Sequence, residues 1–134
     1  MIDGEITEII ARDLAELSGT DLEVVNRLSS LQKLTVEACP NVESLPLPVK
    51  SFDSLTHLTI RNFGNVDQLP ELLSRCPNLE HLDITGTHFP QLFVPNIVAC
   101  KKLKTIEASR DLLTDTVQRD ISYKLPNCSI KVTE

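Results

Sequence analysis

The sequence predicts an α/β solenoid in which short parallel strands alternate with return segments. An apolar phrase recurs at a constant spacing, as a 24-residue repeat, and begins at Leu31, Leu55, Leu79 and Leu103. Apolar residues fill positions 1, 4 and 6 of each phrase and polar residues lie between them, as in a strand that is buried on one side. A fixed period of this length is typical of solenoids, in which each repeat buries its apolar face against its neighbours.

One further step of the same spacing reaches Ile130 and Val132, which fill positions 4 and 6 of a fifth copy. We therefore expect five parallel strands, one at the start of each repeat, and we place the last strand at Ser129–Thr133. Because successive residues of a strand point to opposite faces, positions 3, 5 and 7 should form a solvent-exposed face opposite the apolar core.

The segments that follow the first three strands contain prolines, at Leu45–Pro48, Leu69–Pro70 and Val94–Pro95. Proline has no amide donor, so these segments should return to the next strand outside the sheet. The fourth return segment, 111–121, has neither proline nor glycine. Its apolar residues share one helical face, with Leu112 beside them: Leu113, Val117 and Ile121. We expect a helix here, which together with the last strand closes the C-terminal end.

Residues 1–30 do not follow the repeat and predict a helical N-terminal cap. Four apolar residues share one helical face: Ile6, Ile10, Leu14 and Leu17. Gly19 ends this first helix, and Thr20 and Glu23 have the spacing of a capping box that starts a second helix. The cap and the solenoid of residues 31–134 together form a single structural domain, because the first repeat of a solenoid needs a cover.

The charge of the chain argues against several classes of partner. The 134 residues include 19 acidic and 13 basic side chains, which gives a net charge of −6. Nucleic-acid binding requires a basic surface, so we expect no nucleic-acid partner. No apolar run approaches the ~18 residues of a membrane span, and the first residues lack the basic start and apolar core of a signal peptide. We therefore expect a cytoplasmic protein without a membrane partner.

The cysteines leave two interpretations open. Cys76 and Cys100 are separated by one full repeat and so occupy equivalent positions in neighbouring repeats. They are reduced core thiols in a cytosolic protein, or they form a disulfide between repeats in a secreted one.

The repeats resemble those of leucine-rich repeat proteins over residues 31–134. The copy that begins at Leu31 is similar to repeats of plant immune receptors, whereas Cys76-Pro-Asn-Leu-Glu-His-Leu-Asp-Ile-Thr-Gly86 is similar to repeats of F-box substrate adaptors. The resemblance implies a short right-handed horseshoe arc whose parallel sheet is concave and binds a protein partner. It also implies a polar ladder at position 9, where this chain has Cys39, Phe63, Thr87 and Asp111; Phe63 interrupts that ladder.

On this resemblance the candidate partner-binding residues are those at positions 3, 5 and 7 of the first four strands. The twelve residues are Lys33, Thr35, Glu37, His57, Thr59, Arg61, His81, Asp83, Thr85, Thr105, Glu107 and Ser109. The fifth strand continues the same columns with Ser129, Lys131 and Thr133. Only Arg61 is of a type that often dominates binding energies, so we expect polar, salt-sensitive binding.

His57, His81 and Asp83 form the sharpest chemical group on this face. Two imidazoles and a carboxylate are compatible with a divalent ion such as zinc, but an open sheet rarely directs such ligands to one point. Asp83 and Glu107 are neighbours in one column, yet an open, wet sheet does not tune carboxylates for catalysis. The sequence also lacks a nucleophile motif and a phosphate-binding loop. We expect no metal, no cofactor and no enzymatic activity.

These observations favour a monomeric protein-interaction module that binds a polypeptide on the concave sheet. The alternative is an adaptor or subunit of a larger complex that docks through the acidic N-terminal helices. Such a protein would be a ubiquitin-ligase-like adaptor, or a host-directed effector that is secreted and acts in a host cell. A third possibility is a fragment of a longer receptor.

Overall fold

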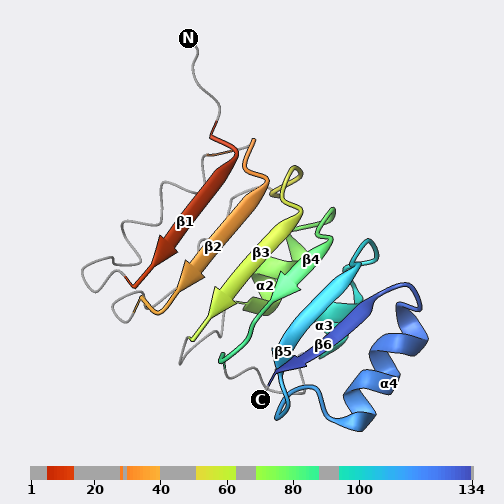
Figure 1. Cartoon of the computed structure of the whole chain (residues 1–134). Coiled ribbons are helices and arrows are strands. Elements are labelled where there is room, and N and C mark those ends of the chain that lie inside the picture. The colour runs from red at the N-terminus through yellow and green to blue at the C-terminus, as the bar shows by residue number, and fades with distance from the viewer. Residues whose placement is uncertain are drawn as a thin grey trace.

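The computed structural model of this chain describes residues 6–13, 28, 30–39, 51–62, 69–87 and 94–133. In chain order, its strands and helices are β1 Glu8–Arg12, β2 Lys33–Glu37, β3 His57–Arg61, α2 Leu69–Ser74, β4 His81–Asp83, α3 Val94–Val98, β5 Thr105–Ser109, α4 Asp115–Lys124 and β6 Ser129–Thr133. The strands form one six-stranded sheet in the order of the chain (Figure 1). Every neighbouring pair is parallel, so the fold is of the α/β type.

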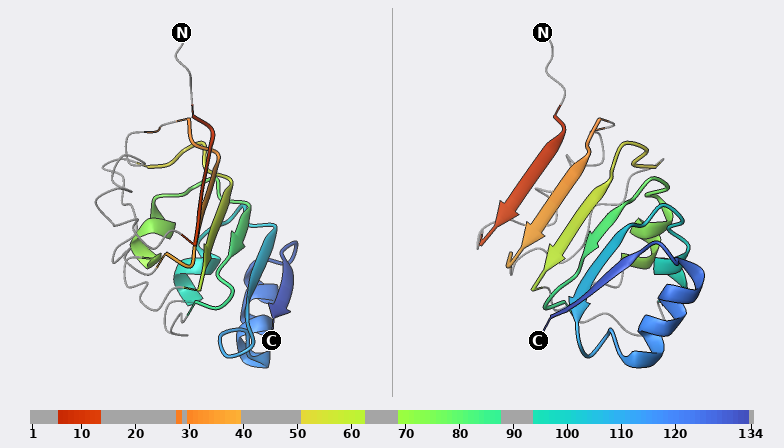
Figure 2. Two further views of the ribbon diagram at one scale, coloured as in Figure 1. Left: turned by 60° about the vertical axis from the view of Figure 1, so that its left-hand side comes forward. Right: turned by 45° about the vertical axis from the view of Figure 1, so that its right-hand side comes forward.

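The helices cover one face of the sheet and leave the other open. Helices α2 and α3 lie on the same side of the strands, and α4 lies beside β6 at the C-terminal edge (Figure 2). Pro70 and Pro95 are each the second residue of a short helix. A missing amide costs little there, because the first amides of a helix have no partner within it. Both proline-containing returns lie outside the sheet, as predicted; the first return, 45–48, lies outside the described residues.

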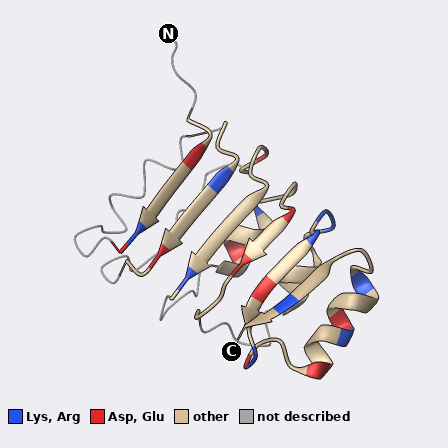
Figure 3. Ribbon diagram, viewed as in Figure 1, with Lys and Arg blue, Asp and Glu red and all other residues tan. Residues whose placement is uncertain are grey.

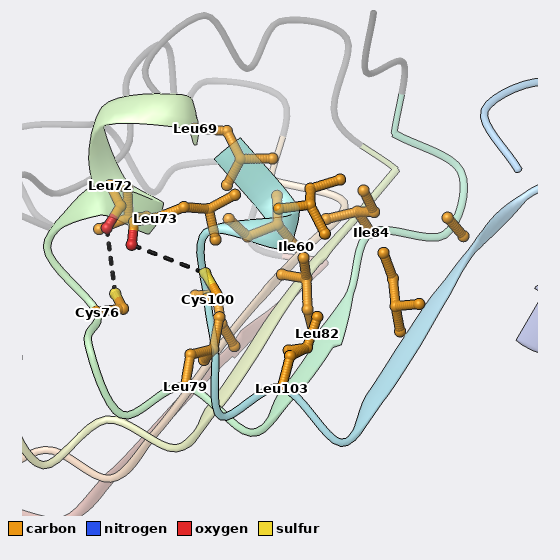
Figure 4. Packing of buried hydrophobic residues seen from close by; sticks show 14 of the residues in the cluster. Ile60, Leu69, Leu72, Leu73, Cys76, Leu79, Leu82, Ile84, Cys100 and Leu103 are labelled. Atoms are coloured by element: carbon orange, nitrogen blue, oxygen red, sulfur yellow. Dashed lines mark hydrogen bonds between the residues drawn. The ribbon is translucent and has the colours of Figure 1, made fainter. Parts of the chain in front are cut away.

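The core lies between the sheet and its helices, and the periodic leucines form its centre. Leu58 and Ile60 of β3 are fully buried, as are Leu69 and Leu72 of α2. Figure 4 shows side chains from α2 and from neighbouring strands meeting in this layer. Burying each of these side chains stabilises the fold by about 1.5–3 kcal/mol. The predicted burial at positions 1, 4 and 6 is confirmed for all four complete repeats.

A backbone turn fixes where each repeat starts. The amide at the start of each described repeat donates to the carbonyl three residues before it, at 3.0–3.3 Å. The donors are Leu31, Leu55, Leu79, Leu103 and Cys128. The first four open the apolar phrase, so strands β2–β5 begin at the same point of their repeats; Cys128 lies one residue further along its repeat, at position 2.

The prediction of a helix from Ile6 onward is wrong for residues 8–12, which form β1. This strand pairs with β2 in the same register as the later strands, Glu8 opposite Lys33. The open edge of β2 offers a row of backbone donors and acceptors, and pairing with it outweighs a local helical preference. The pattern was concealed because Ile6 begins its copy one residue earlier than the constant spacing would place it. The rest of the predicted cap, including Leu14, Leu17 and the capping box, lies outside the described residues.

The predicted C-terminal elements are confirmed, with a shift in the start of the helix. Helix α4 begins at Asp115 rather than 111, because the Thr114 side chain caps it and accepts the Val117 amide at 3.3 Å. Val117 and Ile121 are buried as expected. Leu125 does not continue the helix, since it precedes Pro126 and the residue before a proline avoids helical geometry. Strand β6 has the predicted bounds.

Two of the position-9 side chains, Thr87 and Cys39, bind the preceding strand, whereas Asp111 is exposed. The Thr87 hydroxyl donates to the Ile60 carbonyl at 2.8 Å. The Cys39 thiol donates to the Ala11 carbonyl at 3.7 Å. Both acceptors occupy position 6 of the preceding strand, so each bond ties one turn to its neighbour. Phe63, the predicted interruption, lies outside the described residues.

All four cysteines are free and buried, so the disulfide between Cys76 and Cys100 is not formed. The Cys76 thiol donates to the Leu72 carbonyl at 3.2 Å. Burial raises the pKa of Cys76 to about 12 and that of Cys100 to about 11. Thiols in this state are packing groups and poor nucleophiles.

We predict that a thiol reagent such as DTNB modifies none of the four cysteines rapidly in the native protein. Reaction at pH 8 should be at least ~100-fold slower than in 6 M guanidinium chloride, because each thiol must be exposed by opening of the core. Counting the nitrothiobenzoate released over time measures this. A thiol that reacts in the native protein as fast as in denaturant would contradict the burial described above.

Among the described residues, positive φ angles occur in the turns that follow β1–β4, at position 8. Asp13, Ala38, Asn62 and Gly86 all have positive φ there, between 50° and 72°. Asp, Asn and Gly tolerate this conformation, whereas a left-handed alanine costs roughly 1 kcal/mol. Gly86 also lies against Asn62, since an added Cβ would come within 2.1 Å of the Asn62 side-chain oxygen.

We predict that Ala38→Gly raises the free energy of unfolding by about 0.5–1 kcal/mol, because relief of the strain exceeds the entropy that glycine adds to the unfolded chain. Urea unfolding monitored by circular dichroism measures the change. Ala99→Gly is the matched control: Ala99 is exposed and has no positive φ. The control should lower stability by a similar amount. A destabilised Ala38→Gly variant would refute the assignment of strain.

Candidate binding face

The open face of the sheet carries all twelve residues predicted for partner binding. Eleven belong to β2–β5, and Thr85 follows β4 beside Asn62, whose amide donates to the Thr85 carbonyl. The register places Lys33, His57 and His81 side by side at position 3. The columns predicted from the repeat therefore exist in the structure.

Strand β1 extends this face by one strand that sequence reasoning missed. Glu8, Ile10 and Arg12 lie opposite Lys33, Thr35 and Glu37. Ile10 is 52 % exposed, an apolar residue in a polar column. The signal that would have found it is the apolar spacing of Ile6, Ile9 and Ala11, which matches positions 1, 4 and 6.

A groove of about 420 Å³ crosses this face over β3–β6. Its walls are the columns at positions 3 and 5, and its floor is the backbone between them. The polar lining residues are His57, Thr59, His81, Asp83, Thr105, Glu107, Ser129 and Lys131. Six of these eight are among the twelve predicted residues, and Ser129 and Lys131 continue the same columns on β6.

Arg61 holds together a network of charges on one side of the groove. Its guanidinium donates to the Asp83 carboxylate through two nitrogens, one of them at 2.7 Å, and to Glu107 at 3.1 Å. The other Glu107 oxygen lies 3.3 Å from the Lys131 ammonium. The two acidic side chains, neighbours on β4 and β5, are thus neutralised by a base on each side. Figure 3 shows this interspersed charge across the strands.

The network holds Asp83 in its ionised form. Burial by itself raises the pKa of Asp83, but hydrogen bonds from Arg61 and Thr85 lower it more, so the pKa lies below its ordinary value. The Thr85 amide donates to Asp83 Oδ1 at 3.0 Å. The hydrogen bond to Asp83 raises the pKa of Arg61 in turn. These charges are committed to one another, which leaves Arg61 poorly placed to be the binding hot spot that the sequence suggested.

The opposite wall of the groove contains a stacked pair of imidazoles. The ring centroids of His57 and His81 are 4.3 Å apart, with 29° between the ring planes. His57 Nδ1 lies 2.8 Å from the Thr56 hydroxyl, and His81 Nδ1 lies 2.7 Å from the Thr105 hydroxyl. Burial, with the charges of His81 and Lys33, lowers the pKa of His57. Both rings are therefore oriented by their neighbours, and the lowered pKa favours the neutral form of His57.

The carboxylates near the histidines are already paired with basic side chains. The Asp83 oxygens are bonded to Arg61 and Thr85, so this carboxylate is not free to complete a metal site with the two histidines. Among the described residues no group of three potential metal ligands occurs. Asp83 and Glu107 are both paired with bases, and such pairing opposes the protonated form that a general acid requires.

No protein-family model matches the chain, and a search of curated proteins finds no similar sequence. Within the described part of the chain, no helix is both long and apolar enough to cross a membrane.

We predict that Asp83→Asn lowers the free energy of unfolding by about 1 kcal/mol at pH 7, because it removes a charged hydrogen-bond partner of Arg61 on a partly exposed surface. Since the pKa of Asp83 is depressed in the folded state, its contribution is complete above the unfolded pKa of ~3.9 and is lost as the pH falls through the folded value. The difference in free energy of unfolding between the wild type and Asp83→Asn should therefore become smaller below pH 4.

Urea unfolding of both proteins at pH 7 and pH 3 measures this. Glu71→Gln is the control, because Glu71 forms an exposed ion pair with Arg75 at 3.0 Å. Loss of this ion pair should lower the free energy of unfolding by less than about 0.5 kcal/mol. Equal stability of Asp83→Asn and the wild type at pH 7 would show that the Arg61 network does not stabilise the sheet.

Proposed function

We propose that this chain is a leucine-rich repeat protein, wound as a short right-handed arc, that binds a polypeptide partner on its polar sheet face and catalyses no reaction. Three observations support the proposal: the repeated turn before each strand, the shared strand register and the polar bonds at position 9. All three recur with the 24-residue repeat on which the resemblance to leucine-rich repeat proteins is based. In this proposal the open face is the concave side of the arc.

The groove over β3–β6 is the observation that carries the binding proposal. Neighbouring strands lie ~4.8 Å apart, so the groove spans about 14 Å, the length of roughly four extended residues. The groove offers groups that are not bonded to any described residue: the Ser129 hydroxyl and the Nε2 atoms of both histidines on the position-3 wall, and the Thr59 hydroxyl on the position-5 wall. A partner backbone needs such donors and acceptors when it loses its water. On the position-5 side of the groove, the hydrogen bonds of Arg61 to Asp83 and Glu107 hold the side chains in fixed positions.

The proposal includes the cellular setting that the sequence predicts. We infer a cytoplasmic monomer without a nucleic-acid or membrane partner, and the net charge of −6 supports the absence of nucleic acid. The adaptor alternative needed two N-terminal helices, and residues 8–12 are instead a strand of the sheet. Deleting residues 1–18 would remove β1 together with any docking site, so such a deletion cannot separate docking from folding.

We predict that extended peptides selected on the wild type will depend on the groove. A random peptide library is panned on the protein, and the affinities of the enriched peptides are measured by fluorescence anisotropy. Micromolar peptides should lose at least tenfold in affinity, about 1.4 kcal/mol, on the triple variant His57→Ser, Thr59→Ala, His81→Ser. This variant leaves Arg61 and its partners intact, so the sheet should remain folded.

The matched control changes three exposed residues of α4, Arg119→Ser, Ser122→Ala and Tyr123→Ser, and should bind like the wild type. Circular dichroism and urea unfolding establish that both variants are folded. Peptides that bind both variants equally would place the binding surface elsewhere. Failure to enrich any peptide on the wild type would contradict the proposal itself.

A further inference from the structure

Three nitrogenous side chains lie next to one another in the position-3 column, on β2, β3 and β4. Lys33 is opposite His57, and His57 is opposite His81. We call these three residues the basic row. The histidines form one wall of the groove, and their rings are stacked at a centroid distance of 4.3 Å.

The two imidazoles are held so that one nitrogen of each ring remains available. Threonine hydroxyls occupy both Nδ1 atoms, at 2.8 and 2.7 Å. The Thr56 hydroxyl also lies 3.3 Å from the Gln32 carbonyl, to which it donates. It then accepts from His57 Nδ1, which leaves the neutral ring with a bare Nε2. Neither Nε2 is bonded to a described residue, and protonation turns each into an N–H donor.

The acidic side chains around the basic row are committed or lie beyond it. Glu80 is paired with Lys104 at 3.2 Å. Asp83 and Glu107 are bonded to Arg61. Glu8, on β1, lies beyond Lys33 and raises the pKa of His57 only weakly, as does Glu80, whereas Lys33 and His81 lower it.

Two imidazolium rings stacked at 4.3 Å repel each other, as does the neighbouring ammonium of Lys33. An anion that accepts hydrogen bonds from both Nε2–H groups offsets this repulsion. The row is therefore a poor site for cations and a site for anions once the histidines are protonated.

We propose that the basic row is a proton-gated binding site for an oxyanion, a carboxylate or a tetrahedral oxyanion such as phosphate. The oxyanion accepts hydrogen bonds from Nε2–H of His57 and His81, and Lys33 adds charge at the end of the row. Binding strengthens as the pH falls from 7.5 to 5.5, the range in which histidine gains its proton. The proposal does not depend on the peptide-binding function; where both hold, the oxyanion belongs to an acidic or phosphorylated side chain of the partner.

The test is a nuclear magnetic resonance titration of the histidine rings with sodium sulfate and with sodium acetate, at constant ionic strength set with sodium chloride. Sulfate represents the tetrahedral oxyanions without changing its own charge over this range. We expect at least one of the two salts to raise the titration midpoints of both histidines by about 0.5 unit or more. The apparent Kd should fall about tenfold or more between pH 7.5 and pH 5.5. A response to sulfate alone assigns a tetrahedral oxyanion, and a response to acetate alone assigns a carboxylate.

Single variants separate a built site from general screening. His57→Asn should abolish the salt-induced shift of His81, and His81→Asn that of His57. Lys33→Gln should weaken binding at least about threefold, whereas Lys124→Gln, the same change on α4, should have no effect. No shift beyond that caused by chloride would overturn the proposal, as would equal shifts in the single variants. Because no peptide is present, this outcome is independent of the peptide-binding test.

Discussion

The parallel register of the six strands is the constraint on which the other features of this structure depend. A side chain's face is set by whether its position is odd or even, so a slip of one residue would move the leucines of a strand to the solvent. The turn before strands β2–β5 opposes such a slip, since its backbone hydrogen bond recurs at the first position of their repeats. The same register that stacks Leu58 on Leu82 also aligns His57 with His81 on the other face. Core and candidate binding surface are thus products of one alignment.

On the polar face, Arg61 forms ion pairs with Asp83 and Glu107. Arg61 thus reaches across to β4 and β5. Asp83 also accepts the Thr85 amide at the end of β4, which is three residues long. Such a network rigidifies the face and lowers the conformational entropy that binding would cost. The network also occupies Arg61, the residue that its type alone would favour as a contact for a partner. Most of the groups that remain available lie on the other wall of the groove, where a threonine hydroxyl orients each imidazole.

This division gives the groove two different walls. The Arg61 wall is a set of matched opposite charges. The histidine wall contains the residue type whose ordinary charge change falls between pH 5 and 8. A ligand that spans both walls would contact a rigid set of ion pairs on one side. On the other side it would contact imidazoles, whose charge depends on pH. The proposed peptide site and the proposed oxyanion site therefore share a location but depend on different physical properties.

Sequence periodicity was sufficient for the buried leucines, the last strand, the apolar stripe of α4 and the exposed columns, because each depends only on spacing along the chain. It failed where contacts between side chain and backbone, or between distant strands, decide the outcome. Residues 8–12 form a strand because the edge of β2 satisfies their backbone groups, and α4 begins at Asp115 because Thr114 caps it.

The sequence also placed Arg61, Asp83 and His81 on one face without revealing which side chains bind one another. Only the tertiary structure shows that Arg61 is occupied and that the imidazoles are stacked with free Nε2 atoms. Spacing determines the face on which a residue lies, whereas its hydrogen-bond partners belong to other repeats, distant in the chain, that only folding brings within reach.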